Sequence, residues 1–230
     1  MDRKVPFLLH GLGLLSFGFS FQYIIAHPNV INRGFGGHFQ FLTNIGNTSD
    51  FHQSQLSCVG VWRLVALLLS TLAFTFGMLS DLIPSIALNR LRRIVRFIAM
   101  PLEVTITLSY WLVYFSNMSL LVDQRASPPM PLCRDLGFHF LPTIFLLADY
   151  TVLPPKRALQ MRTDLAVVVF GGALGLYWLW LATCYQRNGY WPYPILARIG
   201  PLVKAILIAA TTVMMSGARF VVLRWSGQRE

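Results

Sequence analysis

The chain has 230 residues, of which 55% are apolar and only 12% are charged. A soluble domain carries about twice that fraction of charge, so this composition is typical of a membrane protein. The formal net charge of +10 does not indicate a nucleic-acid partner, because the basic residues fall between apolar blocks instead of clustering on one soluble face.

A membrane-spanning helix needs about 20 mostly apolar residues. The first apolar stretch follows Arg3 and Lys4, as in a signal peptide, but its apolar core is long and "IIAHPNV" is a poor cleavage site, which favours a retained span. We therefore predict one all-α membrane domain, residues 1–230, built as a transmembrane helix bundle of about six spans. The spans lie near residues 5–26, 57–80, 95–116, 137–153, 165–185 and 200–222.

The distribution of Lys and Arg predicts the orientation, since cytosolic loops carry the excess. With six spans, twelve basic residues fall on the side of both termini and five on the opposite side. Both termini are therefore predicted to be cytosolic. The Asn-x-Ser/Thr sequons at Asn47 and Asn117 fall in the predicted lumenal loops and agree with this orientation. We expect a multi-pass protein of the endomembrane system, first the endoplasmic reticulum, with the plasma membrane as the alternative.

Four ionisable residues lie inside predicted spans, where they are costly and are functional candidates by default. They are Arg63, Glu103, Asp149 and Lys204. For Glu103, a neutral carboxyl hydrogen-bonded inside the bundle is favoured over a catalytic one. For Asp149, solvation at the membrane interface is as good an account as a function. The three cysteines share no metal-ligand spacing, and neither a metal nor an organic cofactor is expected.

The predicted lumenal half gathers a possible catalytic set. Thr43 precedes the second span, His139 opens the fourth and Lys204 opens the sixth. A threonine hydroxyl beside a histidine makes an activated nucleophile, and Asp135 lies one helical turn before His139, where it can orient the ring. Lys204 can stabilise an oxyanion or hold a substrate carboxylate.

A structural interpretation of the same residues stays open. Threonines at the start of a span commonly bond their own backbone, and an interfacial histidine is usually just solvated. The other histidines also compete with His139 for a catalytic role; they are His10, His27, His38 and His52.

Three segments in order, "GGHFQFLT" (36–43), "LGFHFLPTIFLLADY" (136–150) and "NGYWPYPILARIGPLVK" (188–204), carry a family resemblance, with weaker support from "PLEVTITLSYWLVY" (101–114). Together they resemble the androgen-induced gene 1 family of polytopic membrane proteins, which includes the androgen-dependent regulator of tissue factor pathway inhibitor. The resemblance implies a threonine hydrolase acting in lipid metabolism on fatty acid esters of hydroxy fatty acids. It places the nucleophile on Thr43, the histidine on His139 and a basic residue on Lys204.

The main departure from the family pattern lies between Thr43 and the second span. There the stretch "NTSDFHQSQLSCVGVWR", residues 47–63, intervenes and is polar for its first half. Our hypothesis is that 47–63 is an insertion, such as a retained intron, because its deletion joins "FLTNIG" to an apolar run with Thr43 at its mouth. Asp135 stands where the family has a neutral amide, so its orienting role is inferred from its spacing to His139 and not from the resemblance.

The alternative function comes from another class: a non-catalytic polytopic membrane protein that binds lipid or a membrane partner. It needs only packed spans, and it treats Thr43 and His139 as structural. A transporter ranks third, because the sequence lacks the inverted repeat and paired broken helices that transporters show.

Overall fold

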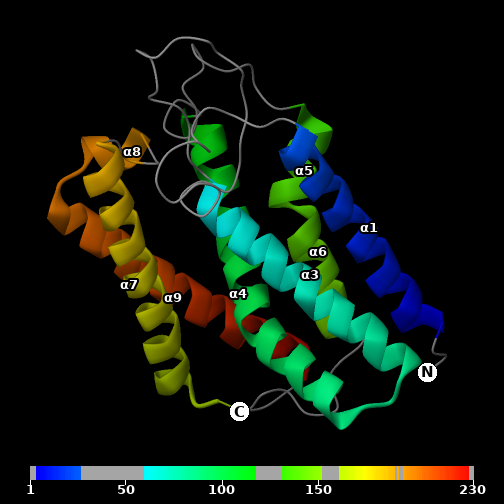
Figure 1. Ribbon diagram of the computed structural model, residues 1–230. Coiled ribbons are helices and arrows are strands. Elements are labelled where there is room, and N and C mark those ends of the chain that lie inside the picture. Colours follow the sequence, from blue (N-terminus) through cyan, green and yellow to red (C-terminus); the bar gives the residue numbers. More distant parts are fainter. Residues whose placement is uncertain are drawn as a thin grey trace.

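The computed structural model describes residues 4–26, 60–117, 131–151, 161–189, 191 and 194–227. Every regular element within these ranges is a helix (Figure 1). The prediction of an all-α bundle is therefore confirmed. The helices are α1 (Lys4–Ala26), α3 (Gly60–Leu82), α4 (Ile86–Asn117), α5 (Leu132–His139), α6 (Leu141–Thr151), α7 (Thr163–Asn188), α8 (Pro194–Arg198) and α9 (Pro201–Trp225).

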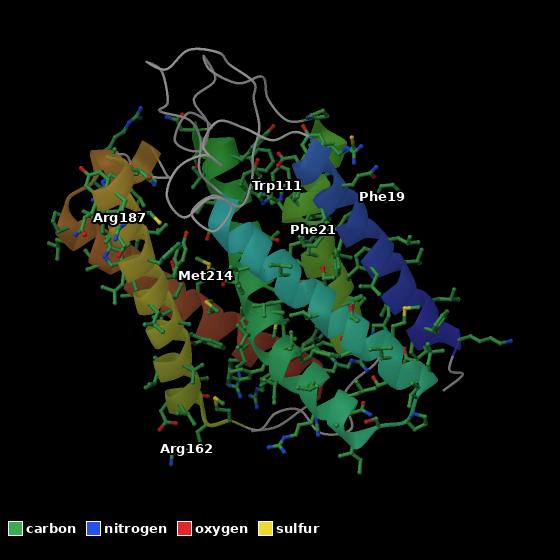
Figure 2. The ribbon with its side chains drawn as sticks, viewed as in Figure 1. Phe19, Phe21, Trp111, Arg162, Arg187 and Met214 are labelled. Carbon is green, nitrogen blue, oxygen red and sulfur yellow. The ribbon has the colours of Figure 1, made fainter. Side chains whose placement is uncertain are left out.

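Five of these helices are long and apolar enough to cross a membrane: α1, α3, α4, α7 and α9. Their outward faces carry large apolar side chains, such as Phe19, which points away from the bundle (Figure 2). Ionisable side chains lie inside instead, and His10, Arg96, Glu103 and Asp149 are each at most 1% exposed. This distribution is the reverse of that in a water-soluble protein and suits a lipid surrounding.

The predicted fourth span, residues 137–153, is not a single helix. It consists of α5 and α6, which are separated at Phe140, where the backbone departs from helical geometry with φ −131° and ψ −51°. Pro142 explains the break, because a proline inside a helix donates no hydrogen bond to the carbonyl four residues earlier and its ring clashes there. The pair also begins five residues before the predicted start, at Leu132.

The predicted third span, residues 95–116, is longer in the structure. Helix α4 begins at Ile86, just after Pro84, and its additional first turns carry three arginines of the predicted cytosolic side, Arg90, Arg92 and Arg93. These turns were missed because their arginines lower the hydropathy. Helix α4 is central to the bundle, since it packs against α3, α5, α6 and α9.

Consecutive spans run in alternating directions, when α5 and α6 are taken as one crossing (Figure 1). We call the end where α1 begins and α9 ends the terminus end of the bundle, and the end where α4 ends and α5 begins the opposite end. In Figure 2, Arg162, the residue before α7, lies at the terminus end, and Arg187, near the end of α7, lies at the opposite end. Within the described residues, α1 therefore begins and α9 ends at the same end of the bundle, while the membrane face of each end stays a prediction.

Helices α1 and α3 approach so closely that only glycine fits at two positions. A Cβ added to Gly77 on α3 would lie 2.6 Å from Nε2 of His10, and a Cβ on Gly13 of α1 would overlap the ring of Phe74. Beside this contact, Phe17 and Phe74 pack edge to face with ring centroids 5.3 Å apart. Small residues of this kind let two helix backbones pack tightly in a membrane.

Candidate functional site

Helix α5 brings together two of the predicted site residues. Asp135 and His139 are one turn apart, and Oδ1 of Asp135 lies 3.4 Å from Nε2 of His139. Both side chains are buried, with His139 0% and Asp135 3% exposed. The predicted pairing of the carboxylate with the imidazole is therefore present in the geometry, although its role in a reaction stays a prediction.

Tyr110 of α4 completes this pair and was missed by the sequence analysis. Its hydroxyl lies 2.8 Å from each carboxylate oxygen of Asp135 and donates its hydrogen bond to that group. Its ring stacks on the imidazole of His139, with centroids 3.5 Å apart and planes inclined by 13°. A tyrosine inside an apolar span needs a partner for its hydroxyl, and this was the available signal.

The end of α5 is held by two threonines. The hydroxyl of Thr107 on α4 donates to the backbone carbonyl of His139 at 2.6 Å, and it lies 2.7 Å from the hydroxyl of Thr143 on α6. Thr107 and Tyr110 lie three residues apart and share one face of α4. One face of α4 therefore positions both the backbone and the side chain of His139.

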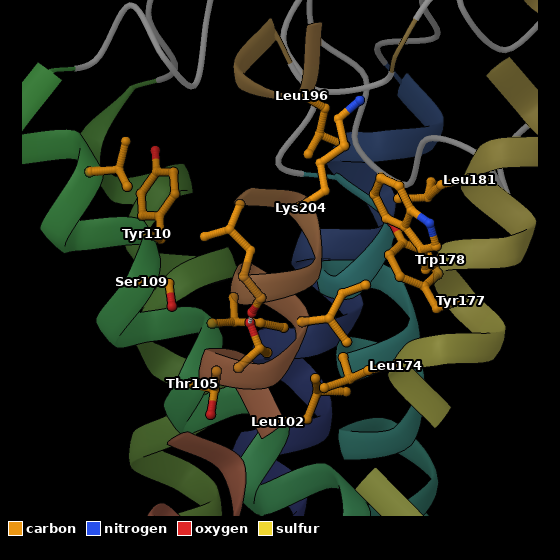
Figure 3. A pocket seen from close by; sticks show the side chains of 15 residues that line it. Leu102, Thr105, Ser109, Tyr110, Leu174, Tyr177, Trp178, Leu181, Leu196 and Lys204 are labelled. Carbon is orange, nitrogen blue, oxygen red and sulfur yellow. Dashed lines mark hydrogen bonds between the residues drawn. The ribbon is translucent and has the colours of Figure 1, made fainter. Parts of the chain in front are cut away.

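A pocket of about 250 Å³ lies between α4, α7 and α9, with Leu196 of α8 at one end. Figure 3 shows Thr105, Ser109 and Tyr110 on the α4 wall and Tyr177, Trp178 and Leu181 on the facing α7 wall. Tyr110 belongs both to this wall and to the contacts of Asp135. His139 is not among the lining residues, and Tyr110 connects it to the pocket.

Lys204, the third predicted site residue, belongs to the pocket and not to the His139 pair. Its ammonium lies 4.1 Å from the ring centroid of Trp191 and 5.9 Å from that of Trp178. Trp191 is itself stacked on Tyr185, with centroids 4.3 Å apart. Among the described residues, Lys204 and Tyr110 line the same pocket, and Tyr110 in turn stacks on His139.

Thr43, the predicted nucleophile, lies outside the described residues, so its distance to His139 is not defined. Residues 47–59 of the suspected insertion lie outside them as well. Residues 60–63 form the first turn of α3, and nothing is described of the Arg63 side chain.

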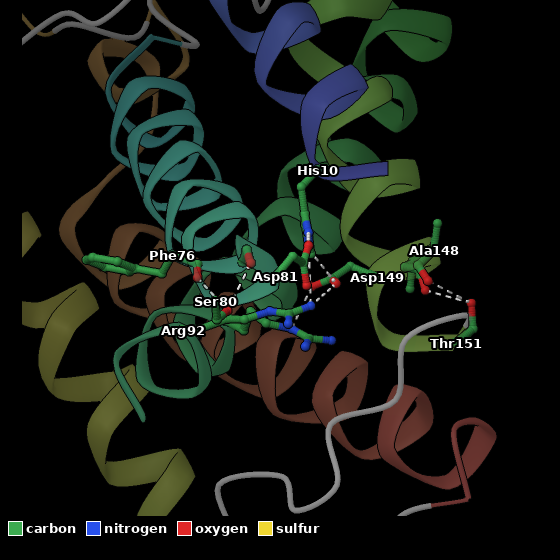
Figure 4. A network of polar contacts seen from close by, with 11 residues as sticks. His10, Phe76, Ser80, Asp81, Arg92, Ala148, Asp149 and Thr151 are labelled. Atoms are coloured by element: carbon green, nitrogen blue, oxygen red, sulfur yellow. Dashed lines mark hydrogen bonds and ion pairs between the residues drawn. The ribbon is translucent and has the colours of Figure 1, made fainter. Parts of the chain in front are cut away.

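A second buried polar cluster lies at the terminus end, and we call it the Asp149 cluster (Figure 4). The imidazole of His10 bridges two carboxylates: Nδ1 lies 2.6 Å from Oδ2 of Asp81, and Nε2 lies 3.1 Å from Oδ1 of Asp149. Arg92 also pairs with Asp149, and Nε of Arg96 lies 2.9 Å from its Oδ2. The cluster joins α1, α3, α4 and α6.

The Asp149 cluster bears on two predictions from the sequence: the surroundings of Asp149 and the role of His10. Asp149 is fully buried, so solvation at the interface is wrong as an account of it. His10, a rival of His139 for the catalytic role, is committed to two carboxylates at the other end of the bundle.

Glu103 accepts a hydrogen bond of 2.9 Å from Ser70, which fits the predicted carboxyl hydrogen-bonded inside the bundle. Among the described residues, no three His, Cys, Asp or Glu side chains gather as metal ligands.

The fold and these sites define an integral multi-pass membrane protein with a buried histidine–aspartate–tyrosine cluster beside an apolar pocket. The family model described as "FAR-17a/AIG1-like protein" matches residues 5–225, and the chain belongs to this family. The resemblance inferred from the sequence is thereby confirmed.

Three curated relatives are similar to the chain. The UPF0641 membrane protein PJ4664.05 of Schizosaccharomyces pombe is 29% identical over 97% of this chain and 90% of its own length. The human androgen-induced gene 1 protein is 24% identical over 52% of this chain and 49% of its own. The UPF0641 membrane protein YHR140W of Saccharomyces cerevisiae is 28% identical over 50% and 51%. No solved structure matches the chain.

Proposed function

We propose that this protein is a membrane-embedded hydrolase of lipid esters, acting on fatty acid esters of hydroxy fatty acids with Thr43 as nucleophile and His139 as base. The observation that carries the proposal is the buried cluster of Tyr110, Asp135 and His139, which shares Tyr110 with an apolar pocket. Membership of the FAR-17a/AIG1-like family supports it.

The proposed reaction uses the two nitrogens of His139 for different tasks. Nε2 lies 3.4 Å from Oδ1 of Asp135, near enough for the carboxylate to orient the ring and to favour a proton on that nitrogen. Nδ1 is then the atom that takes the hydroxyl proton of Thr43 as the threonine oxygen attacks the ester carbonyl. The stacked ring of Tyr110 keeps the imidazole from rotating out of this position.

Two acyl-transfer steps complete the proposed cycle. His139 returns its proton to the departing alkoxide, which leaves as the hydroxy fatty acid and leaves an acyl-threonine behind. Water then attacks the acyl carbon and gives one proton to His139, and that proton returns to the oxygen of Thr43 as the fatty acid departs. One apolar chain of the ester lies between α4, α7 and α9, in the pocket that these helices form.

One observation favours the alternative of a non-catalytic lipid-binding protein. His139 is fully buried and lies behind Tyr110, so it does not line the pocket. If no hydroxyl reaches His139, the cluster serves only to position α5 against α4. The pocket would then hold a lipid without converting it.

The test is labelling of membranes with a fluorophosphonate probe, which reacts only with activated nucleophiles. The proteins compared are the wild type, Thr43→Ala and His139→Ala at matched expression. Thr183→Ala is the control, because its hydroxyl is exposed and bonds its own backbone at Leu179. We expect labelling to vanish in the first two variants only, and ester turnover to fall about 100- to 10,000-fold in His139→Ala.

Two results would contradict parts of this proposal. Wild-type protein that stays unlabelled, in a preparation where a known family member reacts, supports the lipid-binding alternative. Labelling that persists in Thr43→Ala contradicts the assignment of the nucleophile.

A further inference from the structure

The pocket between α4, α7 and α9 has one polar end. In Figure 3 the hydroxyl of Tyr110 and the ammonium of Lys204 both point toward the end where Leu196 of α8 lies. The far part is lined by apolar side chains, including Leu102 and Leu174. A cavity with a polar end and an apolar interior matches an amphiphile with one head group and one chain.

Lys204 gives the polar end a positive charge. Its ammonium is held over the rings of Trp191 and Trp178, and no carboxylate pairs with it within the ranges that the structure covers. A lysine near the end of a span extends its ammonium toward the interface while its stem stays in apolar surroundings. An ammonium fixed by aromatic rings and not neutralised by an acidic side chain is suited to an anionic ligand.

Thr105 is an independent sign that the pocket receives a ligand. Its side chain lines the pocket and is only 3% exposed, and its hydroxyl has no hydrogen-bond partner among the residues described. Buried hydroxyls are rarely left without a partner. A bound molecule with an oxygen atom along its chain supplies one.

The size of the pocket limits the ligand. Its volume of about 250 Å³ is below the roughly 300–1,000 Å³ typical of sites for drug-sized ligands. A two-chain phospholipid is therefore too large, whereas part of one acyl chain fits.

We propose that this pocket binds a single-chain lipid carboxylate, with the carboxylate on the ammonium of Lys204 and the chain between α4, α7 and α9. The assignment rests on the proposed function for one point, that the carboxylate belongs to the acid-bearing chain of the ester or to a fatty acid product. Lys204 is then a positioning residue that selects esters with a free carboxylate, and it does not stabilise the oxyanion beside His139.

The first test is binding of oleate to the full chain in detergent, with oleyl alcohol as the uncharged counterpart. Lys204→Met removes the charge and keeps the length, Lys204→Arg keeps the charge, and Lys4→Met removes a lysine at the terminus end. We expect Lys204→Met to weaken oleate binding roughly tenfold or more and to leave oleyl alcohol unchanged. Lys204→Arg and Lys4→Met should both bind oleate like the wild type.

Two outcomes overturn the proposal. One is oleate binding that is the same in the wild type and Lys204→Met, while binding of oleyl alcohol shows that the variant pocket is intact. The other is Lys204-dependent binding of an oleoyl lysophosphatidate that is tighter than that of oleate, which would assign the cation to a phosphate head group.

The second test separates this proposal from the hydrolase itself. In Lys204→Met, the KM for an acid-bearing ester should rise roughly tenfold with kcat retained, while turnover of its methyl-blocked counterpart stays unchanged. An equal fall of kcat on both esters would assign Lys204 to the oxyanion and contradict the proposal. A wild-type protein that binds oleate through Lys204 but hydrolyses neither ester would sink the hydrolase and leave this site standing.

Discussion

Two buried polar clusters lie against α4, one toward each end of the bundle, and their contacts differ. In the Asp149 cluster, two carboxylates meet two guanidinium groups and the imidazole of His10, and these groups come from four helices. At the opposite end, the carboxylate of Asp135 meets the neutral hydroxyl of Tyr110 and the imidazole of His139, which lies on its own helix.

The difference shows how buried polar groups in one membrane protein can serve separate purposes. Opposite charges that neutralise one another across four helices fix the arrangement of those helices, and removing one charge leaves another uncompensated. A carboxylate held by a hydroxyl and an imidazole keeps a titratable ring oriented beside a pocket. The Asp149 cluster is suited to holding helices together, and the cluster of Tyr110, Asp135 and His139 is suited to orienting a reactive side chain.

The largest expected effect is an all-or-none difference in accessibility between the two ends. Cys133 is exposed at the start of α5, whereas Arg162 is exposed at the terminus end. A variant with Cys133 as its sole cysteine should react with an impermeant maleimide only after the lumenal face is opened. Arg162→Cys, with the three native cysteines replaced, should react from the cytosolic face. The reverse pattern would overturn the predicted orientation and leave the comparison of the two ends intact.

Asp149→Ala should cause the largest loss of stability, about 3–5 kcal/mol, because it leaves the buried Arg96 and the half-buried Arg92 without their carboxylate. The free energy of unfolding in mixed micelles measures it. Asp164→Ala is the matched control, since Asp164 pairs with Arg162 on the surface and should contribute at most about 1 kcal/mol. Equal effects of both variants would contradict a structural role for the Asp149 cluster.

Tyr110→Phe should cost about 1.5–3 kcal/mol, because it removes the hydroxyl that donates to the buried carboxylate of Asp135. It should also reduce probe labelling more than its effect on stability explains, since the orientation of His139 depends on Asp135. Tyr114→Phe, one turn along the same helix, is the control. A variant with normal stability and normal labelling would remove Tyr110 from the site.

Gly77→Ala should destabilise the bundle by about 1–3 kcal/mol, because the new Cβ pushes the ring of His10 away from its two carboxylates. Gly11→Ala is the control, since no atom lies within 4 Å of its added Cβ. Thermal unfolding of both variants in detergent measures the difference. Tolerance of alanine at position 77 would mean that α1 and α3 are packed less tightly than described.

Most of the bundle could be predicted from the sequence, because a helix in lipid must be long and apolar and hydropathy measures both. The errors lie where local chemistry interrupts that rule. Pro142 breaks the fourth span, and three arginines conceal the first turns of α4. Hydropathy says nothing about site residues, and the family resemblance supported the choice of Thr43, His139 and Lys204.

The candidate site was predictable only where its parts are close in the chain. Asp135 and His139 are one turn apart, and that spacing alone suggests their contact. The contact between His10 and Asp149 joins residues 139 positions apart, and Tyr110 meets Asp135 across 25 positions. Such pairs depend on how helices pack, which a single sequence does not reveal. The role of Thr43 stays a prediction.

The tight contact between α1 and α3 also closes that side of the bundle to a lipid chain. Gly13 and Gly77 leave no gap between these two helices. The pocket lies elsewhere, between α4, α7 and α9, so a hydrocarbon tail that leaves the bilayer for it does not pass between α1 and α3. Membrane lipid and ligand are expected to exchange sideways, along α7 and α9.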